Sequence, residues 1–178
     1  MAAAVGLILA GCGGGSGNAD QFSWLHPGAA PAHWRTVSIP NGAALAYPGS
    51  WRRVHGDSGT ATATLSGAGG TIVGYLNVTP RQGSESPANW TSFRISHNAQ
   101  EGDRHVVRLA SGTGLRFRSG TGSCVRDSYT TSSGRPYIEL ACIVRGARAT
   151  TVIVGASPPS QWPRISPQIQ QAISALRT

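Results

Sequence analysis

Short runs of β-branched and apolar residues recur along the chain, and clusters of glycine, serine and proline separate them, as is typical of strands joined by turns. The first two runs, 36–40 and 44–47, flank Asn41-Gly42, a dipeptide that predicts a hairpin turn. Further runs predict strands at 61–65, 71–79, 104–109, 114–118, 124–130, 136–144 and 149–154. The pattern therefore predicts a chain that consists mainly of β-strands.

Two segments show helical spacing of apolar residues instead. Ser86-Pro87 is typical of a helix start, with serine as the N-cap and proline in the first turn, and predicts a helix over about 87–99. Its regularly spaced residues are Trp90, Phe93 and His97. Ser166-Pro167 predicts a second helix start, followed by an apolar stripe of Ile169, Ala172, Ile173 and Leu176. Strand clusters followed by helices predict an α+β fold in which helices cover a largely antiparallel β-sheet.

The N-terminal pattern differs, because an apolar run from Val5 leads into Leu9-Ala10-Gly11-Cys12. Small residues directly before a cysteine resemble the lipobox of bacterial lipoproteins. The resemblance implies a signal peptide over residues 1–11 and a diacylglyceryl group on the Cys12 thiol, which begins the mature chain. Since no lysine or arginine precedes Arg35, we expect the natural start codon to lie upstream. The alternative interpretation is a chance cysteine in an unstructured N-terminus.

The apolar run is too short to cross a bilayer, which requires about 20 apolar residues. We therefore expect the chain to be anchored by lipid at Cys12, on the extracytoplasmic face of the cell membrane. The glycine-rich stretch after Cys12 predicts a flexible tether over 12–33. Residues 34–178 have the usual length of a single domain and can bury a core.

Two further cysteines, Cys124 and Cys142, lie in a chain expected outside the cytoplasm, where disulfides persist. A hairpin centred on Ser133, in a Ser-Ser-Gly turn, sets them directly opposite each other, at a separation that a disulfide can bridge. The same register sets Arg126 opposite Leu140, a charge against an apolar residue, so a bulge or another register stays open. A redox or metal-binding pair is disfavoured, because C-x-x-C spacing is missing.

The net charge of +8 at pH 7 arises from fifteen arginines, no lysine and seven acidic residues. Such an excess attracts anions, including phospholipid headgroups, acidic envelope polymers and nucleic acid, without choosing among them. The arginines are scattered from Arg35 to Arg177 in no long run, which is typical of a solvated basic surface. Aromatic residues do not alternate with them in a reading motif, so we do not expect nucleic acid as a partner.

Motifs of common catalytic sites are missing from the sequence. It contains neither Gly-x-Ser-x-Gly, nor His-Glu-x-x-His, nor a phosphate-binding P-loop. Gly112-Thr113-Gly114 is not placed between a strand and a helix, as a dinucleotide fingerprint requires. We therefore expect no enzyme activity and no cofactor.

One group of residues carries the donor atoms that zinc uses: His97, Glu101, Asp103 and His105 lie within nine residues of each other. Their spacing matches no established ligand pattern, so these four are only a weak candidate for a metal site. A solvated polar loop is the favoured interpretation, and no metal is expected.

Several segments together resemble actinobacterial LpqN/LpqT-type lipoproteins, whose fold is similar to the PsbP-like α/β/α sandwich. They are Val37 to Pro40, Leu45 to Trp51, the helix start near Pro87 and the terminal pattern from Ile169 to Leu176. The resemblance covers roughly 34–177 and implies a PsbP-like domain with a non-catalytic accessory or binding role in the cell envelope. It carries over no catalytic residues.

Tyr47 and Trp51 bracket the Pro-Gly turn of this pattern. We expect both aromatic side chains to pack on the sheet, because aromatic residues in a small domain usually serve the core. Ligand stacking is the alternative role for the pair.

Taken together, these patterns predict a monomeric, lipid-anchored envelope protein that binds an envelope protein, a glycolipid or an anionic polymer. Two alternatives stay open. A carrier of an apolar lipid or glycolipid requires an apolar pocket of several hundred cubic ångströms between sheet and helices. A polyanion-binding surface protein requires an affinity that falls log-linearly with salt concentration.

Overall fold

The computed structural model describes residues 20–178, so the signal-peptide segment, Cys12 and the first part of the glycine-rich stretch lie outside the described residues. Strands β1 (Arg35–Ser38) and β2 (Ala44–Tyr47) form the predicted first hairpin. Its turn follows from the sequence, because Gly42 adopts a positive φ of 90° and the Asn41 side chain accepts a hydrogen bond from the Ala43 amide (2.9 Å).

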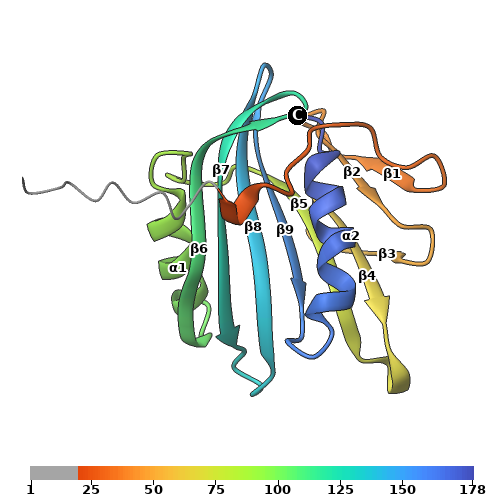
Figure 1. The fold of residues 1–178 in the computed structure, drawn as a ribbon, viewed down its shortest axis with the longest axis vertical. Helices are drawn as coiled ribbons and strands as arrows, with labels where there is room; N and C mark the ends of the chain where they lie inside the picture. The colour runs from red at the N-terminus through yellow and green to blue at the C-terminus, as the bar shows by residue number, and fades with distance from the viewer. Residues whose placement is uncertain (1–19) are drawn as a thin grey trace, which may run out of the picture.

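The other strands form one antiparallel sheet of seven strands, in the order β3-β4-β5-β9-β8-β7-β6 (Figure 1). They are β3 (Arg52–Val54), β4 (Ala61–Ser66), β5 (Ile72–Pro80), β6 (Arg104–Phe117), β7 (Gly120–Thr130), β8 (Pro136–Gly146) and β9 (Thr150–Ser157). The predicted α+β fold is confirmed. The short edge strand β3 was not predicted, because its three residues are all exposed and show no alternation.

One strand prediction was wrong: 104–109 and 114–118 form the single strand β6 rather than two. Its pairing with β7 shifts register at three places. The last shift includes Gly114, whose φ of 65° lets the strand pass through an irregular point. The glycines between the two apolar runs therefore mark a bulge within a strand, not a turn.

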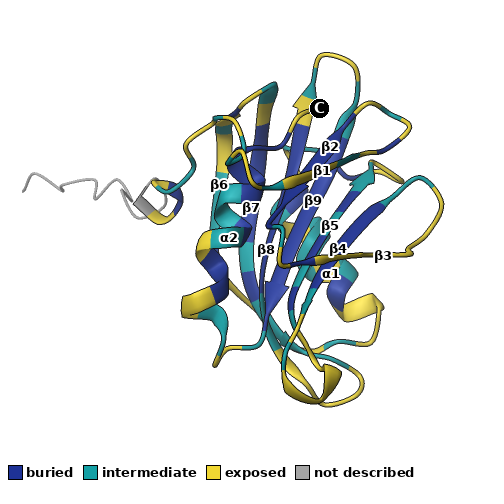
Figure 2. Cartoon of the chain, turned by 90° about the vertical axis from the view of Figure 1, so that its right-hand side faces the viewer, coloured by how far each residue is buried: buried dark blue, intermediate teal, exposed yellow. Residues whose placement is uncertain are grey.

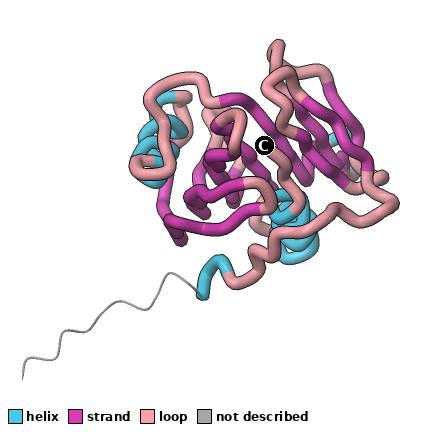
Figure 3. The backbone as a smooth tube through the Cα atoms, turned by 90° about the horizontal axis from the view of Figure 1, so that it is seen from above, coloured by secondary structure: helices cyan, strands magenta, loops and turns pink. Residues whose placement is uncertain are grey.

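The helices α1 (Trp90–Gln100) and α2 (Trp162–Ser174) lie on opposite sides of the strands (Figure 3), and two short 3-10 turns, η1 (Asp20–Phe22) and η2 (Ala68–Gly70), complete the elements. Neither predicted helix start is correct. Ser86 and Asn89 form a turn before α1, in which the Ser86 amide donates to Asn89 Oδ1 (2.7 Å). Helix α2 begins at Trp162, so that Pro163 lies in its first turn and Pro167 inside it.

Burial stabilises α2 in spite of Pro167, which cannot donate the hydrogen bond of a helix interior. Its inward residues Ile165, Ile169 and Ile173 are fully buried against the sheet. Among residues 20–178, no helix has the length and apolar character needed to cross a membrane.

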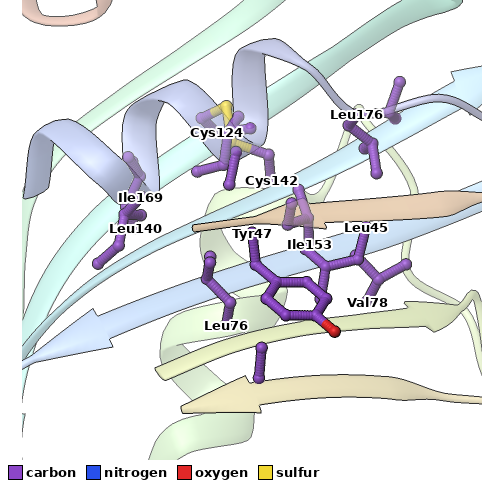
Figure 4. Close-up of a cluster of buried hydrophobic side chains, with 14 of the residues drawn as sticks. Leu45, Tyr47, Leu76, Val78, Cys124, Leu140, Cys142, Ile153, Ile169 and Leu176 are labelled. Carbon is purple, nitrogen blue, oxygen red and sulfur yellow. A yellow bond between two sulfur atoms is a disulfide. The ribbon is translucent and has the colours of Figure 1, made fainter. Parts of the chain in front are cut away.

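The main core fills the space between the sheet and α2 (Figure 4), and buried residues gather along the central strands (Figure 2). Tyr47 and Trp51 belong to this core, with 4% and 0% of their surface exposed. The Trp51 indole N–H donates to Gln168 Oε1 (2.7 Å), which fixes the ring under α2. The structure therefore assigns both aromatics to packing, and the ligand-stacking alternative is wrong.

The predicted disulfide is confirmed: Cys124 and Cys142 are cross-strand partners in β7 and β8 and are joined by a bond that faces α2. The register also pairs Arg126 with Leu140, without a bulge. Instead, the Arg126 side chain reaches the N-terminal segment, where its Nη2 donates to Gln21 Oε1 (3.0 Å). One end of the guanidinium is therefore satisfied by a residue distant in sequence, whereas Arg126 Nε is buried with no hydrogen-bond partner among the described residues.

The segment from Asp20 to His33, which the sequence assigns to the tether, packs on the domain. Phe22 is 4% exposed, and its ring lies so close to Gly112 that a Cβ there would approach within 3.0 Å. Further along, the Gly28 amide donates to the Ser174 carbonyl at the end of α2 (3.2 Å). The tether prediction is therefore wrong for this part of the chain, and the folded body extends to η1.

Candidate binding site

Helix α1 covers one half of the sheet face on its side, because it packs on β6, β7 and β8. Trp90, Phe93 and Ile95 supply its apolar contacts there. The Trp90 indole N–H donates to the Ala141 carbonyl (2.9 Å), which ties the first turn of the helix to the centre of the sheet. The other half of this face, formed by β5 and β9, lies mostly beyond the helix, although Val152 and Val154 of β9 belong to the same apolar cluster as Trp90.

A pocket of about 600 Å³ lies on this second half, between α1 and the outer strands. Alternate residues of β9 and β5 form its floor, since alternate side chains of a strand point to the same face. These floor residues are Val152, Val154, Ala156, Tyr75 and Asn77. The volume falls within the range typical of small-molecule sites.

Helix α1 forms one wall of the pocket, and the opposite edges are loops. The wall residues are Phe93, Arg94 and His97. Asp57 and Thr60 reach the pocket from the loop before β4, and Gln82, Gly83 and Glu85 reach it from the loop before α1. Glu85 is 4% exposed. Its Oε1 accepts a hydrogen bond from the Gln82 amide (2.6 Å) and its Oε2 accepts one from the Gly83 amide (2.7 Å), so the carboxylate fixes the shape of that loop.

A buried ion pair closes one end of the pocket. Arg94 donates from Nε to Glu139 Oε1 (2.6 Å) and from Nη2 to Oε2 (2.7 Å), a bidentate arrangement that joins α1 to β8. The two side chains are 14% and 1% exposed. Burial lowers the pKa of Arg94, but the charge and hydrogen bonds of Glu139 outweigh burial and raise it, so the guanidinium stays charged.

A second buried carboxylate lies directly opposite Glu139 across the strands, at Asp127 of β7. Asp127 has no exposed surface, and its Oδ2 accepts a long hydrogen bond from Asn98 Nδ2 of α1 (3.4 Å). Burial, with the charge of Glu139 added, raises the pKa of Asp127 to about 8. Arg94 thus pairs with Glu139, and a proton on Asp127 relieves the repulsion between the two buried carboxylates under α1.

Aromatic rings line the rest of this end. Phe93 stacks between Trp90 and His97 along α1, with centroid separations of 6.1 and 5.8 Å, and Tyr129 stacks with Tyr137 at 6.1 Å. Burial raises the pKa of both Tyr75 and Tyr129, so their phenols are neutral at physiological pH. The site thus combines neutral aromatic faces, an apolar floor and carboxylates. Of the described residues that line it, none is serine, cysteine or lysine.

The four residues of the weak metal candidate do not come together. His97 Nε2 lies 3.2 Å from Glu101 Oε1, and both line the pocket, whereas Asp103 and His105 do not. Nowhere in the described part of the chain do three or more His, Cys, Asp or Glu residues gather in a way that could hold a metal ion.

Sequence reasoning missed Tyr75, Arg94 and Glu139, which shape the pocket. One signal was available for the last of them: the hairpin register that pairs the two cysteines also sets Asp127 opposite Glu139. Two acidic residues facing each other in strands of otherwise apolar character mark a site that needs a counter-charge. No sequence signal connects Tyr75 or Arg94 to that pair, because both come from distant elements.

No protein-family model matches this chain, and no curated protein sequence matches it. Among solved structures, the cyanobacterial PsbP of Synechocystis sp. PCC 6803 has a TM-score of 0.54 at 12% identity and covers 85% of this chain and 95% of its own. LpqN of Mycobacterium tuberculosis, involved in cell envelope biogenesis, has a TM-score of 0.52 at 13% identity and covers 80% and 88%. A Pseudomonas aeruginosa protein of unknown function has a TM-score of 0.54 at 15% identity and covers 82% and 97%.

These likenesses show the fold and nothing more specific. The chain has a PsbP-like α+β fold, in which a large antiparallel sheet lies between two helices. A fold is shared by proteins of many functions, so any role must be argued from the site.

Proposed function

We propose that this chain is a lipid-anchored protein of the extracytoplasmic membrane face with a non-catalytic binding role, and that the pocket beside α1 is its binding site. The observation that carries the proposal is the pocket itself, about 600 Å³ with an apolar floor, an aromatic wall and a buried ion pair at one end.

Three features support the location in the envelope. The Leu9-Ala10-Gly11-Cys12 segment resembles a lipobox, and the Cys124–Cys142 disulfide is typical of oxidising compartments. The fold is also that of LpqN, which is involved in cell envelope biogenesis in M. tuberculosis. A likeness to LpqN/LpqT-type lipoproteins is therefore part of the proposal.

The packing on the two faces of the sheet supports the α1 side as the binding face. Between the sheet and α2, Leu45, Leu76 and Ile153 are fully buried in the core, which leaves that layer to packing. A lipid carrier that opens between sheet and α2 would have to displace this core. The pocket on the other face needs no such rearrangement.

The pocket can be tested by filling it. We expect native mass spectrometry of the protein purified from its membrane to show a bound small molecule, and we expect Thr79→Trp, at the edge of the floor, to abolish that adduct. Thr113→Trp makes the same substitution at an exposed position of β6 outside the pocket and should keep the adduct. An adduct that survives Thr79→Trp, or a native protein without any adduct, would contradict the proposed site.

A further inference from the structure

The chemistry of the pocket narrows what it can bind. We propose that its ligand is an organic cation with an apolar body, such as a primary or quaternary amine attached to a hydrocarbon or aromatic group. This inference rests on the proposed function, because it names the ligand class of the same pocket.

Charge is unevenly distributed between the pocket and the rest of the molecule. Four of the chain's seven acidic residues line the pocket, and one of its fifteen arginines does. The acidic residues are Asp57, Glu85, Glu101 and Glu139, and the arginine is Arg94. A protein with a net charge of +8 thus concentrates its negative charge at one cavity. A concave site lined by one sign of charge focuses the field on a ligand of the opposite sign.

The groups of the pocket that could bind an anion are already paired. Arg94 directs both Nε and Nη2 to Glu139, and His97 Nε2 faces Glu101 Oε1 at 3.2 Å. An anionic ligand would have to break the buried Arg94–Glu139 pair and leave the carboxylate uncompensated, which is costly. Phosphate groups and carboxylates are therefore poor ligands for this pocket.

Two exposed carboxylates also line the pocket. Asp57 and Glu101 are both exposed and approach the pocket from different elements, the loop before β4 and the C-terminal end of α1. The C-terminus of a helix also carries a partial negative charge. A cation bound beside His97 and Glu101 would be attracted both by the exposed carboxylates and by the C-terminal end of α1.

Aromatic rings form part of the pocket lining. Phe93, Tyr75, Tyr129 and Tyr137 present aromatic rings of intermediate burial to the pocket. The faces of such rings attract ammonium groups, most strongly where water is partly excluded. Val152, Val154 and Ala156 on the floor, with Ile72 at the edge, provide apolar surface for the body of the ligand.

A series of three probes of nearly equal size and different charge tests this inference: benzylammonium, benzyl alcohol and benzoate. Each is titrated into the full-length chain carrying Cys12→Ser, and amide NMR shifts report both affinity and location. We expect the amide shifts at Phe93, Val152 and Val154. We also expect benzylammonium to bind at least about fivefold more tightly than benzyl alcohol. Benzoate should bind most weakly.

Two exposed carboxylates provide variants that do not disturb the core. Asp57→Asn and Glu101→Gln should each weaken benzylammonium roughly two- to fivefold and leave benzyl alcohol unchanged. Gln170→Arg in α2, on the opposite side of the sheet, changes the net charge by the same amount and should affect neither probe.

The outcomes separate the ligand class from the site. If benzyl alcohol binds in the pocket as tightly as benzylammonium, or benzoate binds more tightly, the pocket is a binding site and the cationic ligand class is wrong. If none of the three probes shifts the pocket amides, the proposed binding site is wrong as well. Equal weakening by Gln170→Arg and Glu101→Gln would assign the selectivity to net charge instead of the pocket, which overturns the inference.

Discussion

Asp127 shows how a single buried carboxylate makes stability depend on pH. Burial and the facing Glu139 raise its pKa to about 8, from an ordinary value of 3.8. Between these values the folded state binds more protons than the unfolded state, so the free energy of unfolding falls as pH rises. We predict a slope of up to about 1.4 kcal/mol per pH unit between pH 5 and 8, and its loss in Asp127→Asn. Urea denaturation across this range measures both.

The asparagine keeps the shape of the side chain and its contact with Asn98, so the fold should be retained. Asp57→Asn removes an exposed carboxylate and is the matched control, which should keep the slope of the native chain. If the slope persists in Asp127→Asn, then another group carries the proton, such as Asp103, whose pKa burial also raises.

At the same scale, one predicted hairpin register included the cysteine pair, whereas the acidic pair in the same register was not recognised from the sequence. The turn at Ser133 was sufficient to pair Cys124 with Cys142, and it pairs Asp127 with Glu139 by the same geometry. Arg94 could not be assigned to that pair, because a helix residue reaches a strand only through the tertiary packing of α1. The contact between Arg126 and Gln21 was equally hidden, since it joins positions 105 residues apart.

At the scale of elements, the contact of α2 with β9 depends on a glycine. A Cβ at Gly155 would lie 2.3 Å from Cγ2 of Ile169, which is a fully buried residue of α2. We predict that Gly155→Ala destabilises the chain by about 1–3 kcal/mol through overpacking. Ile169→Ala alone should also destabilise the chain. The double variant Gly155→Ala/Ile169→Ala should lose less stability than the two single variants lose together, because the smaller side chain makes room for the added Cβ. Urea denaturation of the four proteins gives this coupling energy.

Gly28→Ala is the control for these Gly155 and Ile169 variants, because a Cβ at Gly28 makes only an ordinary contact of 3.7 Å with the His26 carbonyl. It should leave the free energy of unfolding close to that of the native chain. Additive effects of Gly155→Ala and Ile169→Ala would show that the helix moves away from the sheet, and would contradict a fixed close approach.

Element positions were easier to predict than their ends. The two helices were found from their apolar spacing, but the Ser-Pro pairs gave the wrong starts. Ser86-Pro87 belongs to a turn that β7 holds in place, through the bond from Ser123 Oγ to the Pro87 carbonyl (2.6 Å). In α2, buried isoleucines outweigh the local preference of Pro167 to begin a helix. Tertiary contacts therefore determine where both helices begin, and such contacts cannot be predicted from local sequence preferences.

For the whole molecule, neither the pocket nor the separation of charge could be read from the sequence. The residues that line the pocket come from α1, four strands and two loops, and the seven acidic residues are spread from Asp20 to Glu139. Only the antiparallel order of the sheet brings β5, β9 and β8 side by side under one cavity. Net charge was visible in the sequence, but its division between an acidic pocket and a basic exterior was not.

That basic exterior and the proposed lipid anchor at Cys12 would hold the protein to a membrane by different forces. Thirteen of the fifteen arginines are exposed, and their attraction to anionic lipids is screened at about 1 M salt, where the Debye length is about 3 Å. Acyl chains act through apolar burial, which salt does not weaken. We predict that the native chain stays in the membrane fraction at high salt and requires detergent for release.

In the same fractionation, we predict that Cys12→Ser is released by high salt alone, because only the electrostatic attraction remains. The Cys124→Ser/Cys142→Ser double variant removes two cysteines but keeps Cys12, and it should require detergent like the native chain. Immunoblots of membranes washed at low and high salt measure all three proteins. A Cys12→Ser chain that still requires detergent would show that the attachment is not through lipid at that residue, and a native chain released by salt would assign attachment to the arginines.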